Sequence, residues 1–276
     1  TNEDGRNRFL MNAALKYKFT DWLNAEVRFG SDMYFTEANT KLYTGSNLNN
    51  GNSSYSLSEK KFYENNYSFL VTAHKDNLFG KFGGTATFGG NMMQRRSTGL
   101  KNSMGTLTVP NLFTIGNGSK GSDLTTEETF SQKKINSLYG TVGVNYDGWA
   151  FLDFTARNDW SSALIDKNRS FFYPSVSLAW VFSDMMNKMD KPLPDWITYA
   201  KARASFAQVG NDMDPYQLYN IYSIGANSGW NNATTATSDK TLFNPDVKSE
   251  LITSWEAGIE MKFFNNRFGF DFAWYK

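Results

Sequence analysis

The 276-residue sequence contains no cysteine, only one histidine and no long run of apolar residues. Without cysteine it can have neither a disulfide framework nor a thiolate metal site. No stretch approaches the roughly 18 apolar residues of a membrane-spanning helix. The 28 Lys and Arg are balanced by 27 Asp and Glu, so no strong positive field would attract nucleic acid. These absences exclude disulfide-stapled domains, helical membrane proteins and nucleic-acid-binding proteins.

Aromatic residues, in contrast, are abundant. They make up 16% of the chain, with 23 Phe, 14 Tyr and 8 Trp. The mean hydropathy is nevertheless −0.51, because apolar residues are interleaved with polar ones. Interleaving at a period of two is the pattern of a sheet with one apolar face and one wet face, and a transmembrane barrel is its extreme case.

This alternation predicts about ten strands in five hairpins. The strand pairs are 9–19 with 23–29, 67–73 with 82–92, 138–146 with 150–156, 176–182 with 200–206, and 255–263 with 268–274. Asp147-Gly148 is a strong signal for a tight turn. We expect another turn at 75–79 and a short helical turn within 183–196.

The connections between the predicted strands alternate between short and long. The long ones are rich in Asn, Ser, Thr and Gly and cover 36–58, 97–133, 159–170 and 211–250. Outer-membrane barrels have short periplasmic turns and long external loops, so they require this alternation. Aromatic residues such as Tyr146 and Trp149 flank the short turns, as in a periplasmic aromatic girdle. The pattern favours a membrane barrel over a soluble sandwich.

Several motifs from residue 135 onward resemble, in the same order, the C-terminal half of the SusC/RagA class of TonB-dependent receptors. The most diagnostic are Asn-Pro-Asp-Val-Lys-Ser-Glu at 244–250, Trp-Glu-Ala-Gly at 255–258 and Phe-Phe-Asn-Asn-Arg at 263–267. Ala-Arg-Asn-Asp-Trp-Ser-Ser at 156–162 is similar to the Arg-Asp-Gly-Ser-Ser segment of that class. Trp160 stands where glycine is usual in the class, and Ser249 replaces a common Trp. Both positions lie in predicted loops, so these departures affect the expected substrate more than the expected fold.

The resemblance implies an all-β, transmembrane, antiparallel up-and-down barrel, of which this chain supplies about ten of 22 strands. We expect residues 1–276 to form one partial barrel domain, with the plug domain and the remaining strands outside this chain. Thr1 to Arg8 lack the apolar core of a signal peptide, which indicates a mature or internal segment. The implied location is the bacterial outer membrane.

The function implied by the resemblance is active import of a large nutrient, an oligosaccharide or a peptide. The implied partners are an extracellular SusD-like lipoprotein and the TonB complex, the latter reached through the missing N-terminal part. The barrel would also contact the lipid bilayer, and no cofactor is expected. A passive porin or structural barrel is the alternative, followed by an outer-membrane hydrolase or a soluble carbohydrate-active sandwich.

No catalytic, cofactor-binding or metal-ligating residue is predicted. His74, between Ala73 and Lys75, is better explained as an interfacial polar residue than as a general base. Acidic pairs such as Asp212 and Asp214 lack the spacing of a calcium loop. Charged residues on the wet faces of the strands are expected to face the lumen: Glu26, Arg28, Asp153, Arg157, Lys201, Arg203, Glu256 and Glu260.

Aromatic rings beside amides in the predicted loops are candidates for contact with a ligand or a partner protein. Rings stack on sugars and peptides while amides form hydrogen bonds. The predicted contact residues are Trp160, Tyr216, Tyr219, Trp230, Asn231 and Asn232.

Overall fold

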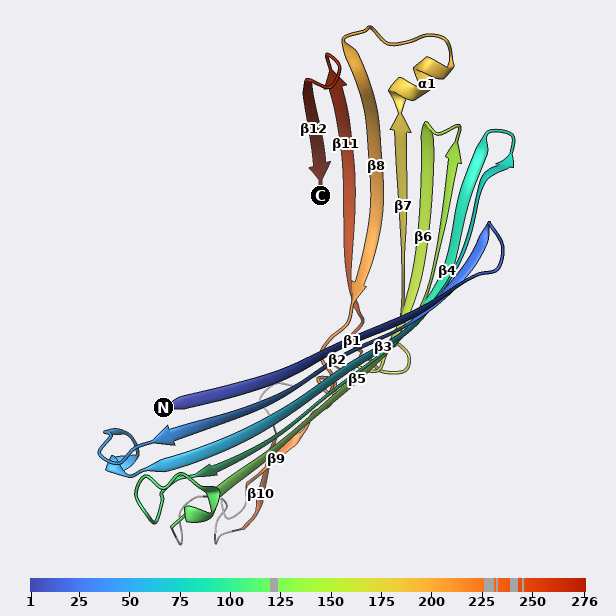
Figure 1. The fold of residues 1–276 in the computed structure, drawn as a ribbon. Coiled ribbons are helices and arrows are strands. Elements are labelled where there is room, and N and C mark those ends of the chain that lie inside the picture. The colour runs from blue at the N-terminus through green and yellow to red at the C-terminus, as the bar shows by residue number, and fades with distance from the viewer. Residues whose placement is uncertain (120–123, 226–230, 232, 239–242, 245) are drawn as a thin grey trace. The chain divides into compact units, whose positions relative to one another are not determined.

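The computed structural model describes residues 1–119, 124–225, 231, 233–238, 243–244 and 246–276 (Figure 1). Ten strands form one antiparallel sheet in the order β1-β2-β3-β4-β5-β6-β7-β8-β11-β12. Their bounds are β1 (Asn2–Lys18), β2 (Leu23–Leu42), β3 (Ser54–Phe79), β4 (Phe82–Met104), β5 (Leu124–Tyr146), β6 (Ala150–Ser161), β7 (Ser170–Val181), β8 (Ile197–Asn211), β11 (Glu250–Phe263) and β12 (Phe268–Tyr275). The predicted all-β meander of about ten strands is confirmed.

The smaller elements lie in the connections. They are η1 (Leu48–Gly51), η2 (Ile115–Asn117), α1 (Phe182–Lys188), and a separate hairpin of β9 (Tyr222–Gly225) and β10 (Thr235–Ser238). Within the described residues, no helix has the length and apolar character that crossing a bilayer requires.

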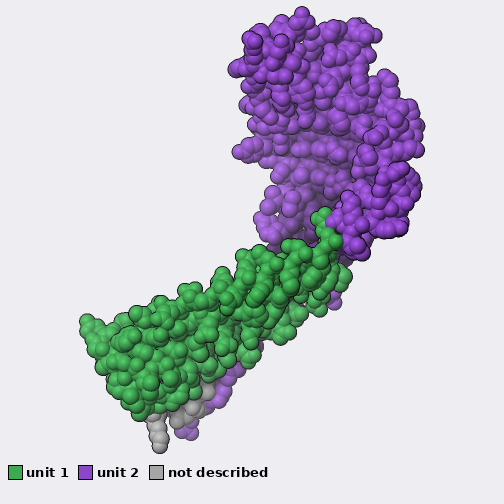
Figure 2. Space-filling model, viewed as in Figure 1, with its two compact units in different colours: residues 1–14, 28–67, 92–134 green, residues 15–27, 68–91, 135–276 purple. Residues whose placement is uncertain are grey.

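The chain divides into two compact units, coloured separately in Figure 2. Unit 1 contains residues 1–14, 28–67 and 92–134, and unit 2 contains residues 15–27, 68–91 and 135–276. Strands β1 to β5 contribute to both units, whereas β6 to β12 belong to unit 2 alone. The short turns of the meander therefore lie in unit 2.

The strand register in unit 2 separates an apolar face from a polar one. Between β11 and β12, Ala257 pairs with Trp274 and Ile259 pairs with Phe272. The intervening position, Gly258, belongs to the other face, because successive residues of a strand alternate. Trp255 continues the apolar face into β8, where it pairs with Phe206 and their rings lie 4.6 Å apart. This register is the one that the alternation predicts.

The turn between β5 and β6 matches its sequence signal. Asp147 has a φ of 50° and Gly148 a φ of 71°. Positive φ at both central residues is the type I′ geometry, and the turn is closed by the Trp149 amide, which donates to the Tyr146 carbonyl oxygen at 3.1 Å. The predicted helical turn is also present as α1, with Asp184 in its first turn and Lys188 in its last, as the helix dipole favours.

Two predicted loops are about half strand in the structure, so the bounds predicted for these long connections are wrong. The 36–58 prediction is wrong because β2 continues to Leu42 and β3 begins at Ser54. The 97–133 prediction is wrong because β4 continues to Met104 and β5 begins at Leu124. Apolar residues are sparse in most of these strand ends, so the backbone ladders continue where the alternation is too weak to reveal them.

The turn predicted at 75–79 lies farther along the chain in the structure, again because the alternation at the end of β3 is weak. Strand β3 runs on to Phe79, and the chain reverses at Gly80, whose φ is 58°, and Lys81. The sequence also missed the β9–β10 hairpin inside the long 211–250 connection, where four-residue strands carry too little alternation to be recognised.

Aromatic rings gather at the short-turn ends of the strands in unit 2. Phe79 lies 5.0 Å from Phe82, Phe82 lies 4.8 Å from Tyr146, and Tyr146 lies 5.3 Å from Trp149, measured between ring centroids. Similar contacts join Trp180 to Phe182 and Trp196 to Phe263. The aromatic residues predicted beside the short turns therefore make ring contacts at each of these turns.

Candidate functional site

The polar face of unit 2 carries an arginine that bridges three strands. Arg203 on β8 donates from both terminal nitrogens to Asp271 on β12, at 2.9 and 3.0 Å. Its Nε donates to Glu256 on β11, at 3.2 Å. A Cβ added to Gly258 would lie 2.9 Å from Arg203 Cζ. Because Gly258 has no side chain, the Arg203 guanidinium has room to cross β11 and reach Asp271.

A second cluster surrounds Asp159 near the far end of β6. Arg157 Nε donates to Asp159 Oδ1 at 2.9 Å, and the Tyr173 hydroxyl donates to Oδ2 at 2.6 Å. The same guanidinium donates to Ser137 Oγ at 3.0 Å and lies over the Tyr139 ring at 5.6 Å. Asp159 is buried. Its charge is matched and hydrogen-bonded, as burial requires, so this part of the wall is a fixed polar surface.

The short-turn rim is held by one carboxylate between two lysines. Lys188 of α1 donates to Asp147 Oδ1 at 2.7 Å, and Lys81 donates to Oδ2 at 2.8 Å. These hydrogen bonds, first that of Lys188 and then that of Lys81, hold the pKa of Asp147 below its ordinary value. Asp147 therefore ties the β5–β6 turn to the β3–β4 turn and to α1.

At the opposite end of the strands, the long connection after β8 is anchored to the wall. The fully buried Ser161 donates its hydroxyl to Asp212, immediately after β8. Farther on, the Phe243 amide donates to Asn220 Oδ1 at 2.9 Å. These contacts fix the segment that contains the predicted contact tyrosines.

The predicted contact residues Tyr216 and Tyr219 lie on this anchored segment. Leu218 between them is only 5% exposed, whereas Tyr216 is 52% and Tyr219 is 64% exposed. Leu218 packs inward while the two phenol rings lie at the surface. Asn231 is also exposed, and the predicted contacts Trp230 and Asn232 lie outside the described residues. Contact of these residues with a ligand or partner stays a prediction.

Trp160 occupies a different place from the loop tyrosines. It lies within β6, paired with Asn136 and Ser170, on the same face as Phe154. This is the apolar face, not the face that holds Arg157 and Asp159. The register therefore favours a membrane-interface position for Trp160 over contact with a ligand in the lumen.

His74 is hydrogen-bonded on both ring nitrogens. Nδ1 lies 2.8 Å from Thr85 Oγ1 and Nε2 lies 3.0 Å from Asp76 Oδ1. The connectivity is that of a nucleophile, a base and an acid, but the His74 and Asp76 side chains are 53% and 86% exposed. A catalytic triad instead buries its carboxylate. In the described part of the chain, no group of three or more His, Cys, Asp or Glu side chains is placed to hold a metal ion.

Sequence reasoning missed Tyr173 and Asp271 as members of these clusters. Both occupy polar-face positions that the alternation of β7 and β12 would have assigned. Asp271 lies two strands away from its partner Arg203 in the sheet order. A list of inward-facing residues does not reveal such a diagonal contact.

The family model described as "TonB dependent receptor-like, beta-barrel" matches residues 1–276. The chain belongs to this family. It is therefore part of the wall of a β-barrel in the bacterial outer membrane, as the SusC/RagA resemblance implied. Its apolar face contacts lipid, its polar face lines the lumen, and its short turns are periplasmic.

Individual relatives give the same result. The chain is 26% identical, over 97% of its length, to a TonB-dependent receptor of Formosa agariphila, and covers 27% of that protein. It is 26% identical over half its length to TonB-dependent receptor SusC of Bacteroides thetaiotaomicron, covering 14% of it. The RagAB peptide importer in its closed-closed state shares the fold, with a TM-score of 0.88 over 100% of this chain and 30% of that one, at 18% identity. The chain thus spans less than a third of these relatives.

Proposed function

We propose that the full-length protein carrying this chain actively imports a large nutrient, an oligosaccharide or a peptide, across the outer membrane. The observation that carries the proposal is the division of one sheet into a lipid face and an ion-paired lumen face. Family membership and the likeness in fold to a peptide importer support it further.

The lumen clusters suggest how the wall serves transport. Arg203 pairs with two carboxylates, Glu256 and Asp271, and Arg157 pairs with Asp159. Because these side chains bond to one another, they are less available to retain a charged solute than unpaired charges would be. In this proposal the wall is a conduit and performs no chemistry. Replacement of His74 by Ala should leave transport unchanged and remove no hydrolytic activity.

We propose further that the anchored loop after β8 contacts the nutrient or an extracellular SusD-like lipoprotein. Tyr216 and Tyr219, with Trp230, Asn231 and Asn232, are the candidate contacts. Exposed tyrosines on a fixed segment support the idea, because such rings bind with little loss of conformational entropy. Coupling to TonB would occur through segments outside this chain.

The import proposal is tested by uptake in cells. Cells with the gene deleted and complemented are given fluorescent peptides and oligosaccharides, with and without a protonophore. Complemented cells should accumulate one of the two solute classes, and the protonophore should abolish this accumulation. Uptake that persists without the proton-motive force would overturn active import and favour the passive porin.

The contact site is tested separately on the purified full-length protein. Tyr219→Ala should weaken binding of the imported solute or of the lipoprotein about tenfold, as expected for an interfacial aromatic residue. Leu48→Ala provides the control, because Leu48 is equally exposed but belongs to the β2–β3 connection. Equal affinities for both variants would remove this loop from the binding site.

We also propose that residues 1–276 are one partial barrel domain that requires further strands. In the described part of the chain, β1 and β12 each pair with a single neighbour in the sheet. Each unsatisfied backbone group in hydrocarbon costs several kcal/mol. Expressed alone, the chain should therefore not give a heat-modifiable, protease-resistant monomer in detergent. A monodisperse, ion-conducting monomer would refute the partial-barrel proposal.

A further inference from the structure

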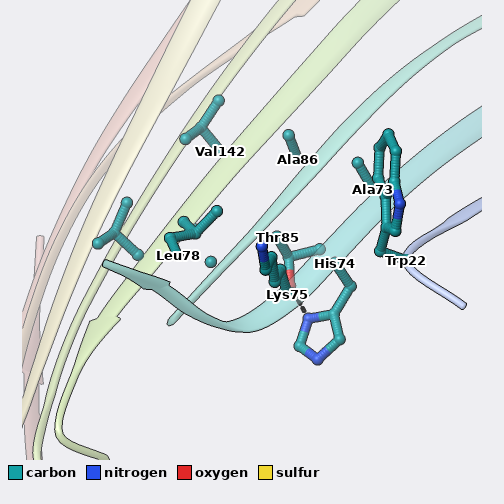
Figure 3. A pocket seen from close by; sticks show the side chains of 11 residues that line it. Trp22, Ala73, His74, Lys75, Leu78, Thr85, Ala86 and Val142 are labelled. Atoms are coloured by element: carbon teal, nitrogen blue, oxygen red, sulfur yellow. Dashed lines mark hydrogen bonds between the residues drawn. The ribbon is translucent and has the colours of Figure 1, made fainter. Parts of the chain in front are cut away.

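The lipid-facing surface of unit 2 contains a groove at the periplasmic end of the strands (Figure 3). Small residues, Ala73 on β3 and Ala86 on β4, lie between larger side chains. Trp22 borders Ala73 on one side, and Leu78 and Val142 stand on the other. The groove has a volume of about 380 Å³, within the range of small-molecule sites.

The backbone fixes the shape of this groove. The His74 amide donates to the Trp22 carbonyl oxygen at 2.8 Å, which holds the β1–β2 turn against β3. A Cβ added to Gly84 would lie 2.8 Å from Leu78 Cδ1, so the glycine lets Leu78 lie across β4. Strand pairing and one glycine therefore position the turn and the Leu78 side chain that border the groove.

A single cation lies on the groove at the membrane interface. Lys75 lines it and is exposed, and among the described residues its ammonium group has no ion-pair partner. The aromatic contacts of Phe79, Phe82 and Tyr146 mark the same end of the strands. Amphipathic rings and lysines at this depth reach the level of the phospholipid headgroups.

We propose that this groove binds one anionic phospholipid of the inner leaflet, with an acyl chain along Ala73 and Ala86 and the phosphate on Lys75. The apolar floor suits a hydrocarbon chain, and the unpaired ammonium complements a negatively charged headgroup. The inference goes beyond nutrient import and depends only on the location in the outer membrane.

A second barrel is a poorer occupant of the same groove. The lipid-facing wall of another copy would cover Lys75 with apolar side chains and leave its charge buried and unpaired. A phospholipid covers the apolar floor and neutralises the ammonium at the same time.

Native mass spectrometry of the full-length protein in detergent tests the proposal, with phosphatidylglycerol and phosphatidylcholine of identical chains as probes. The unmodified protein should retain phosphatidylglycerol about fivefold more tightly, as expected for one lysine near an anionic headgroup. Lys75→Gln should abolish this preference. Ala86→Leu, which fills the floor, should weaken retention of both lipids.

Matched controls separate the groove from general effects on the barrel. Lys191→Gln removes an exposed lysine of the β7–β8 connection, and Ala257→Leu enlarges an exposed lipid-face alanine of β11; neither residue lines the groove. Both variants should behave as the unmodified protein. Equal retention of phosphatidylglycerol by Lys75→Gln and Lys191→Gln would overturn the proposal. So would a dimer that Ala86→Leu alone dissociates.

Discussion

The strands of the chain fall into two groups of different length. Strand β3 has 26 residues and β4 has 23, whereas β6 and β7 have 12 each. A tilted transmembrane strand needs only about 9–11 residues. Strands β6 and β7, which lie wholly in unit 2, are close to this minimum. Strands β3 and β4 continue well beyond it into unit 1.

The two units also differ in how they use the faces of the sheet. In unit 1, neighbouring residues of β2 both make aromatic contacts, although they point to opposite faces. Tyr34 stacks on Phe62 at 4.6 Å, and Phe35 meets Tyr63 edge-on at 5.7 Å. In unit 2, the apolar pairs of β11 and β12 lie on one face and the ion pairs on the other. Lipid imposes a division of faces that a strand surrounded by water does not need.

A charge placed on the outward face should give the largest difference in stability loss between the two units. Val176→Arg, in the middle of β7 between Phe154 and Phe206, should lower the free energy of unfolding by about 2–4 kcal/mol, because the charge enters hydrocarbon. Leu100→Arg in the unit 1 part of β4 should change it by less than about 0.5 kcal/mol. Denaturant titration of the full-length protein in lipid vesicles measures both. Equal losses would mean that unit 1 also contacts lipid.

A methyl group added to a glycine should show the next largest contrast. In unit 2, Gly258→Ala meets the Arg203 guanidinium and the Phe272 carbonyl oxygen, at 2.9 and 3.1 Å, and should destabilise by about 1 kcal/mol. Gly5→Ala in unit 1 meets nothing within 4 Å and should cause no loss. Gly269→Ala is the control within unit 2, since its nearest atoms are 3.5 Å away. The same denaturant titration measures the three variants. If Gly258→Ala left the stability unchanged, the Arg203 contacts with Glu256 and Asp271 would not depend on the missing side chain at Gly258.

The ion pairs of Asp147 with Lys81 and Lys188 should make the local stability of the periplasmic rim of unit 2 depend on pH. Because the folded-state pKa of Asp147 is lowered, its ion pairs stabilise above the ordinary pKa of 3.8 and are lost as the pH falls through the lowered value. Asp147→Asn keeps a residue suited to the positive φ but removes the charge, so α1 should exchange its amide hydrogens faster at neutral pH. Hydrogen exchange followed by mass spectrometry measures this difference, which should vanish in acid. A difference that persists in acid would assign the effect to the turn geometry instead.

The smallest effect is expected at the end of unit 1. The Glu3 carboxylate accepts a hydrogen bond from Lys41 at 2.9 Å, which is the first cause of its lowered pKa, followed by a hydrogen bond with Asn39. Glu3 is exposed and Lys41 is half-buried, and a single ion pair at such a surface position contributes little. Glu3→Gln should leave the thermal unfolding of the full-length protein unchanged. A measurable drop in the unfolding temperature would show that unit 1 depends on its ion pairs more than its exposure suggests.

The order of residues along the chain was enough to predict the architecture wherever lipid faces the sheet. The period-two pattern assigned Ile259 and Phe272 to one face and Glu256 to the other, and Asp147-Gly148 located its turn, because a hydrocarbon surface and a tight turn each restrict the residues allowed. The same reasoning placed Arg203 on the lumen face. It failed for the long ends of β2 to β5, where apolar residues are sparse and the period-two pattern is weak.

Which of these residues contact one another became known only from the folded sheet. Arg203 reaches Asp271 across β11, Trp22 lies against β3, and Trp160 faces away from Arg157. Each of these placements depends on the register between strands and on a missing side chain or a backbone hydrogen bond between segments distant in sequence. Alternation along one strand gives the face of a residue but not its neighbour across the sheet, because the stagger between strands is set only when their backbones pair.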